Sequence, residues 1–378
     1  MVLQELNTLL VISIYGALLL LSFLTLANPL KVNKKANFWL GIFFLLWSTF
    51  WLDEILWLSL GRIPGLCHSV LFSFLQYFTP IVFYLSVLFF TNPDYRFRTT
   101  DVKYLVLPLI FLLVLIIQEV SGTRNSPTFQ YLPAALILVQ TLCYSVLSFV
   151  KIKQHQRKVL LFASSTDEIN LKWLEKVIIL ILAISIIISL YNVIYRLSSL
   201  NLFMNIIFLV VIFMIAYYTI KQKEIFPPDK QLRSEIMAIR EEKHSTEVKR
   251  KIISDEELSV LKARMNQIMI QQQPYLDSEL NLIKLAGVIG ITPHQLSYVI
   301  NAGFHENFFQ FINKYRVERA KELLVNAGMN HLSMLGIAFE SGFNSKTSFN
   351  TTFKKFTRQT PSEFKKTLMK RVECKEAL

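Results

Sequence analysis

Polar and cationic side chains gather on one short segment near the end of the sequence, around a pair of aromatic residues. Phe349 and Phe353 are four residues apart, which places both on one side of a helix. The other positions suit the base edges of a DNA major groove, and the cationic residues that follow suit phosphates. The candidate base contacts are Ser345, Lys346, Thr347, Asn350 and Thr351, and the candidate phosphate contacts are Lys354, Lys355 and Arg358. The segment therefore predicts a DNA-binding helix.

The residues before this segment are typical of a second helix that holds the first in place. Ser333 can cap a helix start, because its hydroxyl accepts a hydrogen bond from an unpaired backbone N–H. Gly342 can adopt the left-handed conformation that ends this helix, and the small side chain of Ala338 lets the next helix cross closely. The two helices together predict a helix-turn-helix unit.

The same pattern occurs a second time upstream. Ala286 and Gly290 repeat the four-residue spacing, and Leu296 and Ile300 stand where the later copy has its two phenylalanines. Apolar residues at helical spacing over residues 308–324 predict a rigid connecting helix between the two units. The candidate base contacts of the first unit are Thr292, which would also cap the helix, and His294, Gln295, Ser297 and Tyr298.

Residues 275–366 resemble the DNA-binding domain of AraC/XylS-type transcriptional regulators. The matching residues are Leu285-Ala286, Gly290, Leu296-Ser297, Tyr315-Arg316, Ala320, Leu323-Leu324, Ile337-Ala338, Gly342-Phe343, Ser348-Phe349, Phe353-Lys354-Lys355 and Thr360-Pro361. This resemblance implies two helix-turn-helix units on one linking helix, which bind double-stranded DNA sequence-specifically. One departure is Arg358, where the family usually has glycine; the arginine either stiffens this loop or adds a phosphate contact.

The N-terminal part of the chain has a different composition. Of the 378 residues, 53% are hydrophobic and 30 are Phe, which is unusual for a soluble protein. Residues 1–220 contain only 15 Lys or Arg and 9 Asp or Glu. A signal peptide would explain one apolar run, whereas this part has seven. We therefore expect the N-terminal part to lie in a lipid bilayer.

Most of the seven runs have the roughly 17–25 residues that cross a bilayer as a helix. They are residues 7–27, 36–57, 68–92, 104–118, 129–150, 177–195 and 197–220. The first, third and fifth connections between them contain twelve Lys and Arg, and the other three contain three. By the positive-inside rule the N-terminus is outside and the C-terminal domain is in the cytoplasm. The expected location is the cytoplasmic membrane of a bacterium, as a multi-pass protein.

Asp53 and Glu54 form an acidic pair within the second apolar run. Placing both charges at the bilayer centre would cost roughly 5–7 kcal/mol on insertion scales. One interpretation places them at the outer membrane interface, where this cost is avoided. The other makes them a polar sensing site inside the bundle.

The predicted organisation is all-α. A seven-helix transmembrane bundle covers residues 1–222, a charged helical linker 223–273, the tandem helix-turn-helix domain 274–368 and a basic tail 369–378. In the linker, Ser254 and Glu257 predict a helix start, and this helix would carry an apolar stripe. The stripe either packs on the DNA-binding domain or forms a homodimer contact; its residues are Leu258, Leu261, Met265 and Ile268.

Catalytic and metal-binding patterns are missing from the sequence. The three cysteines and six histidines are scattered, and His305-Glu306 is not followed by the second histidine of a zinc-protease helix. No glycine-rich phosphate loop occurs. We therefore expect no catalytic residues, no metal and no cofactor.

Together these parts predict a membrane-anchored one-component transcriptional regulator whose bundle receives the signal. The expected outer loops are too short to fold alone, so the input would be a lipophilic ligand, a lipid state or a membrane-protein partner. The output would pass through residues 217–223 into the linker. Two alternatives stay open: a transporter or lipid-modifying enzyme that regulates its own supply, and a transporter-like or receptor-like protein whose helix-turn-helix domain is a protein-interaction module.

The predicted topology can be tested with the native cysteines. Cys67 lies in an outer loop and Cys374 in the cytoplasmic tail of the predicted arrangement. A membrane-impermeant thiol reagent should therefore label Cys67 in intact cells, as measured by mass spectrometry. Labelling of Cys374 under the same conditions would overturn the seven-span topology.

Overall fold

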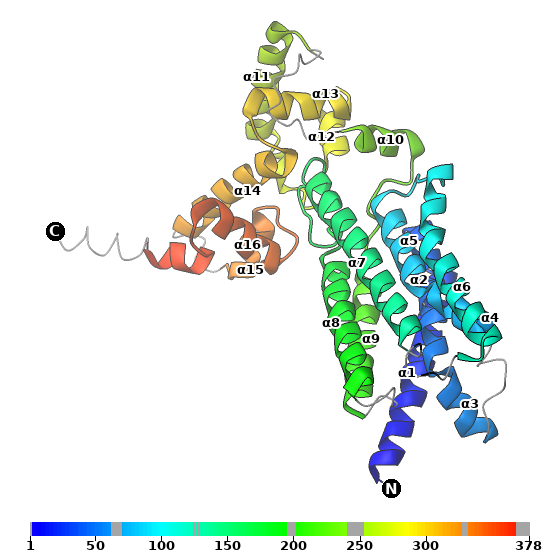
Figure 1. The fold of residues 1–378 in the computed structure, drawn as a ribbon. Helices are drawn as coiled ribbons and strands as arrows, with labels where there is room; N and C mark the ends of the chain where they lie inside the picture. Colours follow the sequence, from blue (N-terminus) through cyan, green and yellow to red (C-terminus); the bar gives the residue numbers. More distant parts are fainter. Residues whose placement is uncertain are drawn as a thin grey trace. The chain divides into compact units, whose positions relative to one another are not determined.

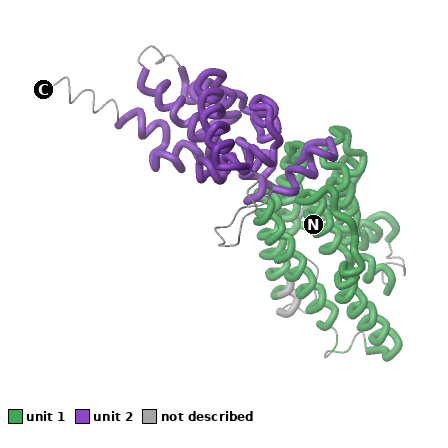
Figure 2. Tube along the Cα trace, turned by 90° about the horizontal axis from the view of Figure 1, so that it is seen from above, with its two compact units in different colours: residues 1–155, 171–225 green, residues 156–170, 226–378 purple. Residues whose placement is uncertain are grey.

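The computed structural model describes residues 2–61, 70–123, 126, 129, 131–194, 202–239, 253–326 and 332–367. Within these residues the regular structure is helical, which confirms the all-α fold class, and one isolated bridge pairs Ala163 with Asn281. The chain forms two compact units (Figure 2). Residues 1–155 and 171–225 make up unit 1, and residues 156–170 and 226–378 make up unit 2. Cys67, Cys374 and the tail 369–378 lie outside the described residues.

Unit 1 consists of long apolar helices (Figure 1). They are α1 (Val2–Ala27), α2 (Lys34–Ser48), α3 (Leu52–Leu60), α4 (Val70–Tyr77), α5 (Thr79–Thr91), α6 (Val106–Val120), α7 (Leu132–Val159), α8 (Lys172–Ile194) and α9 (Leu202–Lys221). Short 3₁₀ segments join some of them, at Thr49–Trp51 and Thr99–Leu105. The last turn of α7, from Gln156 on, already belongs to unit 2.

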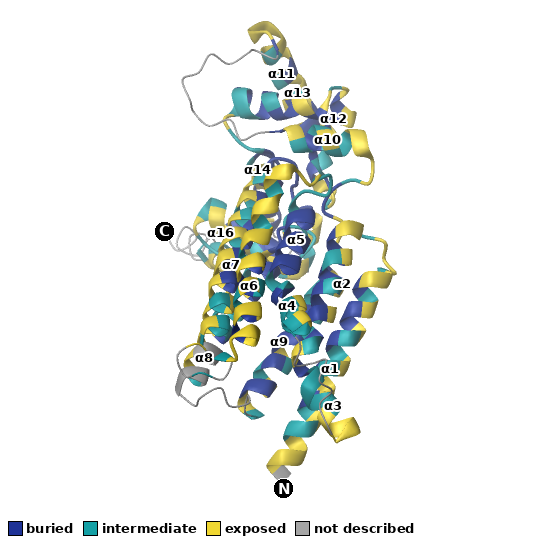
Figure 3. Ribbon diagram, turned by 45° about the vertical axis from the view of Figure 1, so that its right-hand side comes forward, coloured by how far each residue is buried: buried dark blue, intermediate teal, exposed yellow. Residues whose placement is uncertain are grey.

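Helix α1 packs against α2 and α9, and α2 packs against α5. At the α1–α2 contact, Ser22 Oγ donates to the carbonyl oxygen of Gly41 at 2.9 Å, and a Cβ at Gly41 would collide with Leu26. Small residues and hydroxyl groups at helix contacts are typical of helix pairs in membranes. Many large apolar residues of these helices are exposed. Figure 3 colours the exposed residues yellow. This outer surface suits a lipid environment.

Six stretches in unit 1 are long and apolar enough to cross a membrane, judged by length and composition among the described residues. They coincide with the first five and the seventh of the predicted spans. The second combines α2 with α3, and the third combines α4 with α5. The predicted sixth span falls on α8, which is a 23-residue helix, and its role as a membrane span stays a prediction.

The predicted acidic pair lies in the first turn of α3. Glu54 Oε1 accepts a hydrogen bond from Asn7 Nδ2 at 3.2 Å, and Asn205 Nδ2 donates to Asn7 Oδ1 at 2.8 Å. Trp51 Nε1 donates to Asn205 Oδ1 at 3.4 Å. Glu54 thus takes part in a polar chain that joins α1, α3 and α9.

Unit 2 contains shorter helices (Figure 1). They are α10 (Lys230–Ala238), α11 (Asp255–Gln271), α12 (Leu282–Ile289), α13 (Pro293–Tyr298), α14 (Phe308–Val325), α15 (Met334–Glu340) and α16 (Lys346–Thr357). A 3₁₀ turn covers Pro274–Leu276, and a π-helical turn covers Val299–Gly303. Helices α14, α15 and α16 pack on one another around a common core.

The helix predicted after Ser254 is α11, and Ser254 Oγ accepts from the Glu257 amide at 3.2 Å as expected. Three residues of its apolar stripe are buried, with Leu261 7%, Met265 0% and Ile268 8% exposed, and Leu258 is half-buried. Helix α11 packs beside α12 and the π-helical turn. Of the two alternatives for this stripe, packing within unit 2, against α12 and the π-helical turn, is therefore the one observed. The homodimer contact stays a prediction, and α11 belongs to unit 2, not to a separate linker.

Candidate nucleic-acid interface

Helices α15 and α16 form the second helix-turn-helix unit. Ser333 caps α15 by accepting from the Gly336 amide at 3.0 Å, and Ser345 caps α16 by accepting from the Ser348 amide at 3.1 Å. In the turn between them, Gly342 has φ +83°, a left-handed value that glycine adopts at little cost. The local signals in the sequence thus correctly predicted the start of α15 and the turn.

The inner face of α16 anchors it to the unit. Phe349 and Phe353 are fully buried, with ring centroids 5.6 Å apart, and Phe343 lies 5.2 Å from Phe349. Ala338 of α15 and Ala320 of α14 are in the same core cluster, and both are fully buried. Side chains this tightly packed orient α16 about its own axis. The position of every other residue on the helix follows from that orientation.

The outer face of α16 carries most of the predicted contacts. The exposed residues are Lys346, Thr347, Thr351, Lys354, Lys355 and Arg358, and Asn350 is half-buried. Lys355 Nζ lies 5.4 Å from the centre of the Phe309 ring, so its position is restrained. Arg358 ends the helix with φ +63°, which explains why glycine suits this position and shows that arginine is strained here. This face carries cationic and hydroxyl groups.

Helices α12 and α13 form the first unit. Gly290 ends α12 with φ +80°, and Ala286 and Leu296 are buried as predicted. Thr292 and Gln295 form a capping box, in which the Gln295 amide donates to Thr292 Oγ1 at 3.2 Å and the Thr292 amide donates to Gln295 Oε1 at 3.0 Å. Their polar groups are thus already engaged in holding the start of α13.

Ser297 does not lie on the outer face of α13. It is 7% exposed, because it is four residues after buried Pro293 and three before buried Ile300, which places all three on one side. The Asn301 amide group also donates to its hydroxyl at 3.4 Å. Thr292 and His294 are exposed, and Gln295 and Tyr298 are half-buried. Of these four residues, His294 and Tyr298 are the two that take no part in the capping box.

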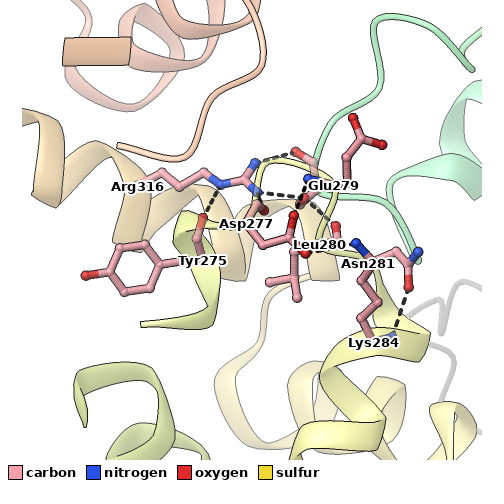
Figure 4. A network of polar contacts seen from close by, with 8 residues as sticks. Tyr275, Asp277, Glu279, Leu280, Asn281, Lys284 and Arg316 are labelled. Carbon is pink, nitrogen blue, oxygen red and sulfur yellow. Dashed lines mark hydrogen bonds and ion pairs between the residues drawn. The ribbon is translucent and has the colours of Figure 1, made fainter. Parts of the chain in front are cut away.

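The connecting helix α14 carries a buried arginine, whose polar contacts are drawn in Figure 4. Arg316 is 1% exposed. Its Nε donates to the Tyr275 carbonyl at 2.7 Å, and its Nη2 donates to the Asp277 carbonyl at 2.8 Å and to Ser164 Oγ at 3.0 Å. Burial lowers the pKa of Arg316 to about 10, against the opposing effect of the Asp277 and Glu279 charges, so the side chain stays protonated at neutral pH. The sequence included Arg316 in the family pattern, but no local signal revealed this role.

Asp277 supports the same region from the outside. Burial by itself would raise the pKa of its carboxyl group, but hydrogen bonds from Lys284 Nζ and the Glu279 amide, both 2.9 Å long, lower it. Asp277 is therefore a carboxylate that ties the connection after α11 to α12. In the described part of the chain, no three His, Cys, Asp or Glu side chains gather as metal ligands.

The similarity to known proteins lies in the two helix-turn-helix units and the helix that connects them. Residues 285–367 match the family model described as a helix-turn-helix domain. This match agrees with the resemblance of the same region to the AraC-type DNA-binding domain.

Curated relatives named as HTH-type transcriptional regulators are similar over the same region. An uncharacterized one from Staphylococcus aureus (strain COL) is 29% identical over 102 residues, which are 27% of this chain and 13% of that protein. The one in the cgkA 5′ region of Pseudoalteromonas carrageenovora is 30% identical over 90 residues, 24% of this chain and 51% of that protein. No solved structure gives a significant match. The AraC-type domain thus supports a DNA-binding regulator.

Two glycines of this domain provide a matched test of the packing around Arg316. A Cβ at Gly342 would collide with the backbone of Tyr275 and Leu276, whereas one at Gly290 would meet only Arg264 Nη2 at 3.7 Å. Gly290→Ala should cost about 1–2 kcal/mol of stability, because its φ is positive. Gly342→Ala should cost about 1–3 kcal/mol more, because backbone must also move. Hydrogen exchange of the α14 amides measures both, and equal losses would contradict the packing described.

Proposed function

We propose that this protein is a membrane-anchored one-component transcriptional regulator that binds DNA sequence-specifically through α13 and α16. The observation that carries the proposal is the outer face of α16, where exposed cationic and hydroxyl residues lie opposite two fully buried phenylalanines. Recognition helices of helix-turn-helix proteins enter the major groove with such a face. Major grooves on one side of DNA recur about every 34 Å, so two units joined by α14 are suited to adjacent turns.

The contacts are proposed from exposure and chemistry. In the second unit, Lys346, Thr347, Asn350 and Thr351 read base edges, while Ser345 serves chiefly as the helix cap. Lys354, Lys355 and Arg358 contact phosphates. In the first helix-turn-helix unit, His294 and Tyr298 are the main proposed base contacts. Thr292 and Gln295 contact DNA only through groups that the capping box leaves available. Ser297 is left out of the proposed set because it is buried.

The membrane part of the proposal rests on the apolar helices of unit 1. Their exposed faces and their length support a multi-pass anchor in a bacterial cytoplasmic membrane, with unit 2 in the cytoplasm. The signal is a lipophilic molecule, a lipid state or a membrane-protein partner that binds two arrangements of these helices unequally. In this scheme DNA binding is the output.

The DNA contacts can be tested with the full-length protein in detergent and promoter fragments recovered by chromatin capture. Lys346→Ala should weaken binding by about 1–3 kcal/mol, because a good base contact is lost. Lys355→Ala should weaken all DNA sequences alike and lower the salt slope by about one, because a phosphate contact is lost. Fluorescence anisotropy at several salt concentrations measures both effects.

Lys314→Ala is the control, because Lys314 is an exposed lysine of α14 and not of the proposed recognition helices α13 and α16. Its Nζ is paired with Glu306 Oε1 at 3.3 Å. It should bind DNA like the wild type. If Lys346→Ala, Lys355→Ala and Lys314→Ala all keep the wild-type affinity and salt slope, α16 does not contact DNA.

The site of signal input can be tested with a chimera. The helices of unit 1 are replaced by those of an unrelated protein of the same topology, while residues 156–170 and 226–378 are kept because they form unit 2. The chimera should express and bind the promoter but no longer respond to the native stimulus in a reporter assay. A chimera that still responds would show that sensing lies outside the replaced helices.

A further inference from the structure

A segment that lies between α7 and α8 in the sequence is part of the DNA-binding unit. The carbonyl oxygen of Phe162 accepts from the Leu282 amide at 2.9 Å, and that of Leu160 accepts from the Phe309 amide at 3.0 Å. Leu282 and Phe309 lie in the first turns of α12 and α14, where backbone amides have no partner within their own helix. The segment thus completes the starts of two helices that position both DNA-reading units.

Ser164 fixes this segment in the interior. Its carbonyl oxygen accepts from Asn313 Nδ2 at 2.9 Å, and its hydroxyl donates to the Leu280 carbonyl at 2.5 Å and accepts from Arg316 Nη2 at 3.0 Å. Ser164, Asn313 and Arg316 are each 1% exposed. Buried polar groups held in this way need every partner. Ser164 is therefore part of the buried hydrogen-bond network of unit 2 and not a surface contact.

Three residues further on, the segment reaches the start of α16. Ser345 Oγ donates to Asp167 Oδ2 at 3.2 Å, and Ser345 is the N-cap of α16. The N-terminus of a helix carries partial positive charge and attracts an anion. It is also the end of a recognition helix that approaches base edges in the major groove. The Asp167 carboxylate therefore lies where negatively charged DNA has to approach.

We propose that residues 160–167 are an intramolecular ligand of the DNA-binding unit, in which Ser164 anchors the segment and Asp167 competes with DNA for the start of α16. This inference rests on the proposed function, because it assigns the regulation of the same interface. The segment is joined covalently to α7 on one side and α8 on the other. A movement of either helix withdraws Asp167 and so raises DNA affinity. The signal thus has a route to α16 that bypasses residues 217–223.

The test is the DNA affinity of Asp167→Asn in the full-length protein, measured by anisotropy on the captured promoter fragment. Asparagine keeps an oxygen that can accept from Ser345, so the variant removes the charge alone. It should bind about five-fold or more tightly than the wild type, the lower end of usual coupling between sites. Asp167→Ser, which removes charge and reach together, should do the same.

Two controls separate this mechanism from other effects. Glu256→Gln removes the same charge from an exposed position in the first turn of α11 and should leave the affinity unchanged. Hydrogen exchange of the Leu282 and Phe309 amides should be as slow in Asp167→Asn as in the wild type, which shows that the segment is still docked. Wild-type affinity in both Asp167 variants, or an equal gain in Glu256→Gln, would overturn the proposal. If the wild type itself shows no salt-dependent DNA binding, the proposed function fails instead.

Discussion

A single buried charge organises the C-terminal unit. Arg316 is 1% exposed, and the acceptors that its guanidinium group reaches are neutral: the carbonyls of Tyr275 and Asp277, and Ser164. Burying a charge without satisfied donors is very costly, so these partners have to be held in place. The connection after α11, the helix α14 and the segment around Ser164 are consequently tied to one another. Gly342 is required beside them because a side chain there would collide with the Tyr275 backbone.

The two helix-turn-helix units are built alike but present different chemistry. Helix α16 exposes three lysines and a terminal arginine, whereas α13 exposes a histidine and uses its threonine and glutamine to cap itself. In the proposed function the second unit therefore supplies most of the salt-dependent attraction to phosphates. The first unit contributes a firmly capped helix whose remaining polar groups are few. Placing Asp167 at the start of α16 is consistent with regulation acting on the unit with the stronger electrostatic contribution.

Unit 1 uses a different kind of packing. The contact between α1 and α2 involves Gly41 and the hydroxyl of Ser22, and polar residues join α1, α3 and α9 by hydrogen bonds among otherwise apolar surfaces. In lipid, the hydrophobic effect does not drive helices together. Helices there associate through close packing at small residues and through interhelical hydrogen bonds. Unit 2 instead buries a cluster of phenylalanines and leucines, as water-soluble domains do. The contrast agrees with the uneven charge along the chain.

The sequence by itself determined those features that depend on residues close to one another along the chain. The helix caps at Ser254, Ser333 and Thr292, the turn at Gly342 and the inner face of α16 were all predicted, because caps, glycine turns and helical periodicity are local. The all-α fold and most of the apolar spans follow from the same periodicity and composition. The outer face of α16 could also be listed residue by residue, since two phenylalanines orient the helix.

Only the tertiary structure decided what depends on distant residues. Ser297 is buried because of what packs against α13, and the stripe of α11 is covered by the DNA-binding unit itself. Arg316 and Ser164 are 152 residues apart, and Ser345 and Asp167 are 178 apart. No spacing rule connects residues so far apart, because the contact forms only when separate helices pack. For the same reason, the sequence placed residues 156–170 in a cytoplasmic connection between two predicted spans, whereas the fold makes them part of unit 2.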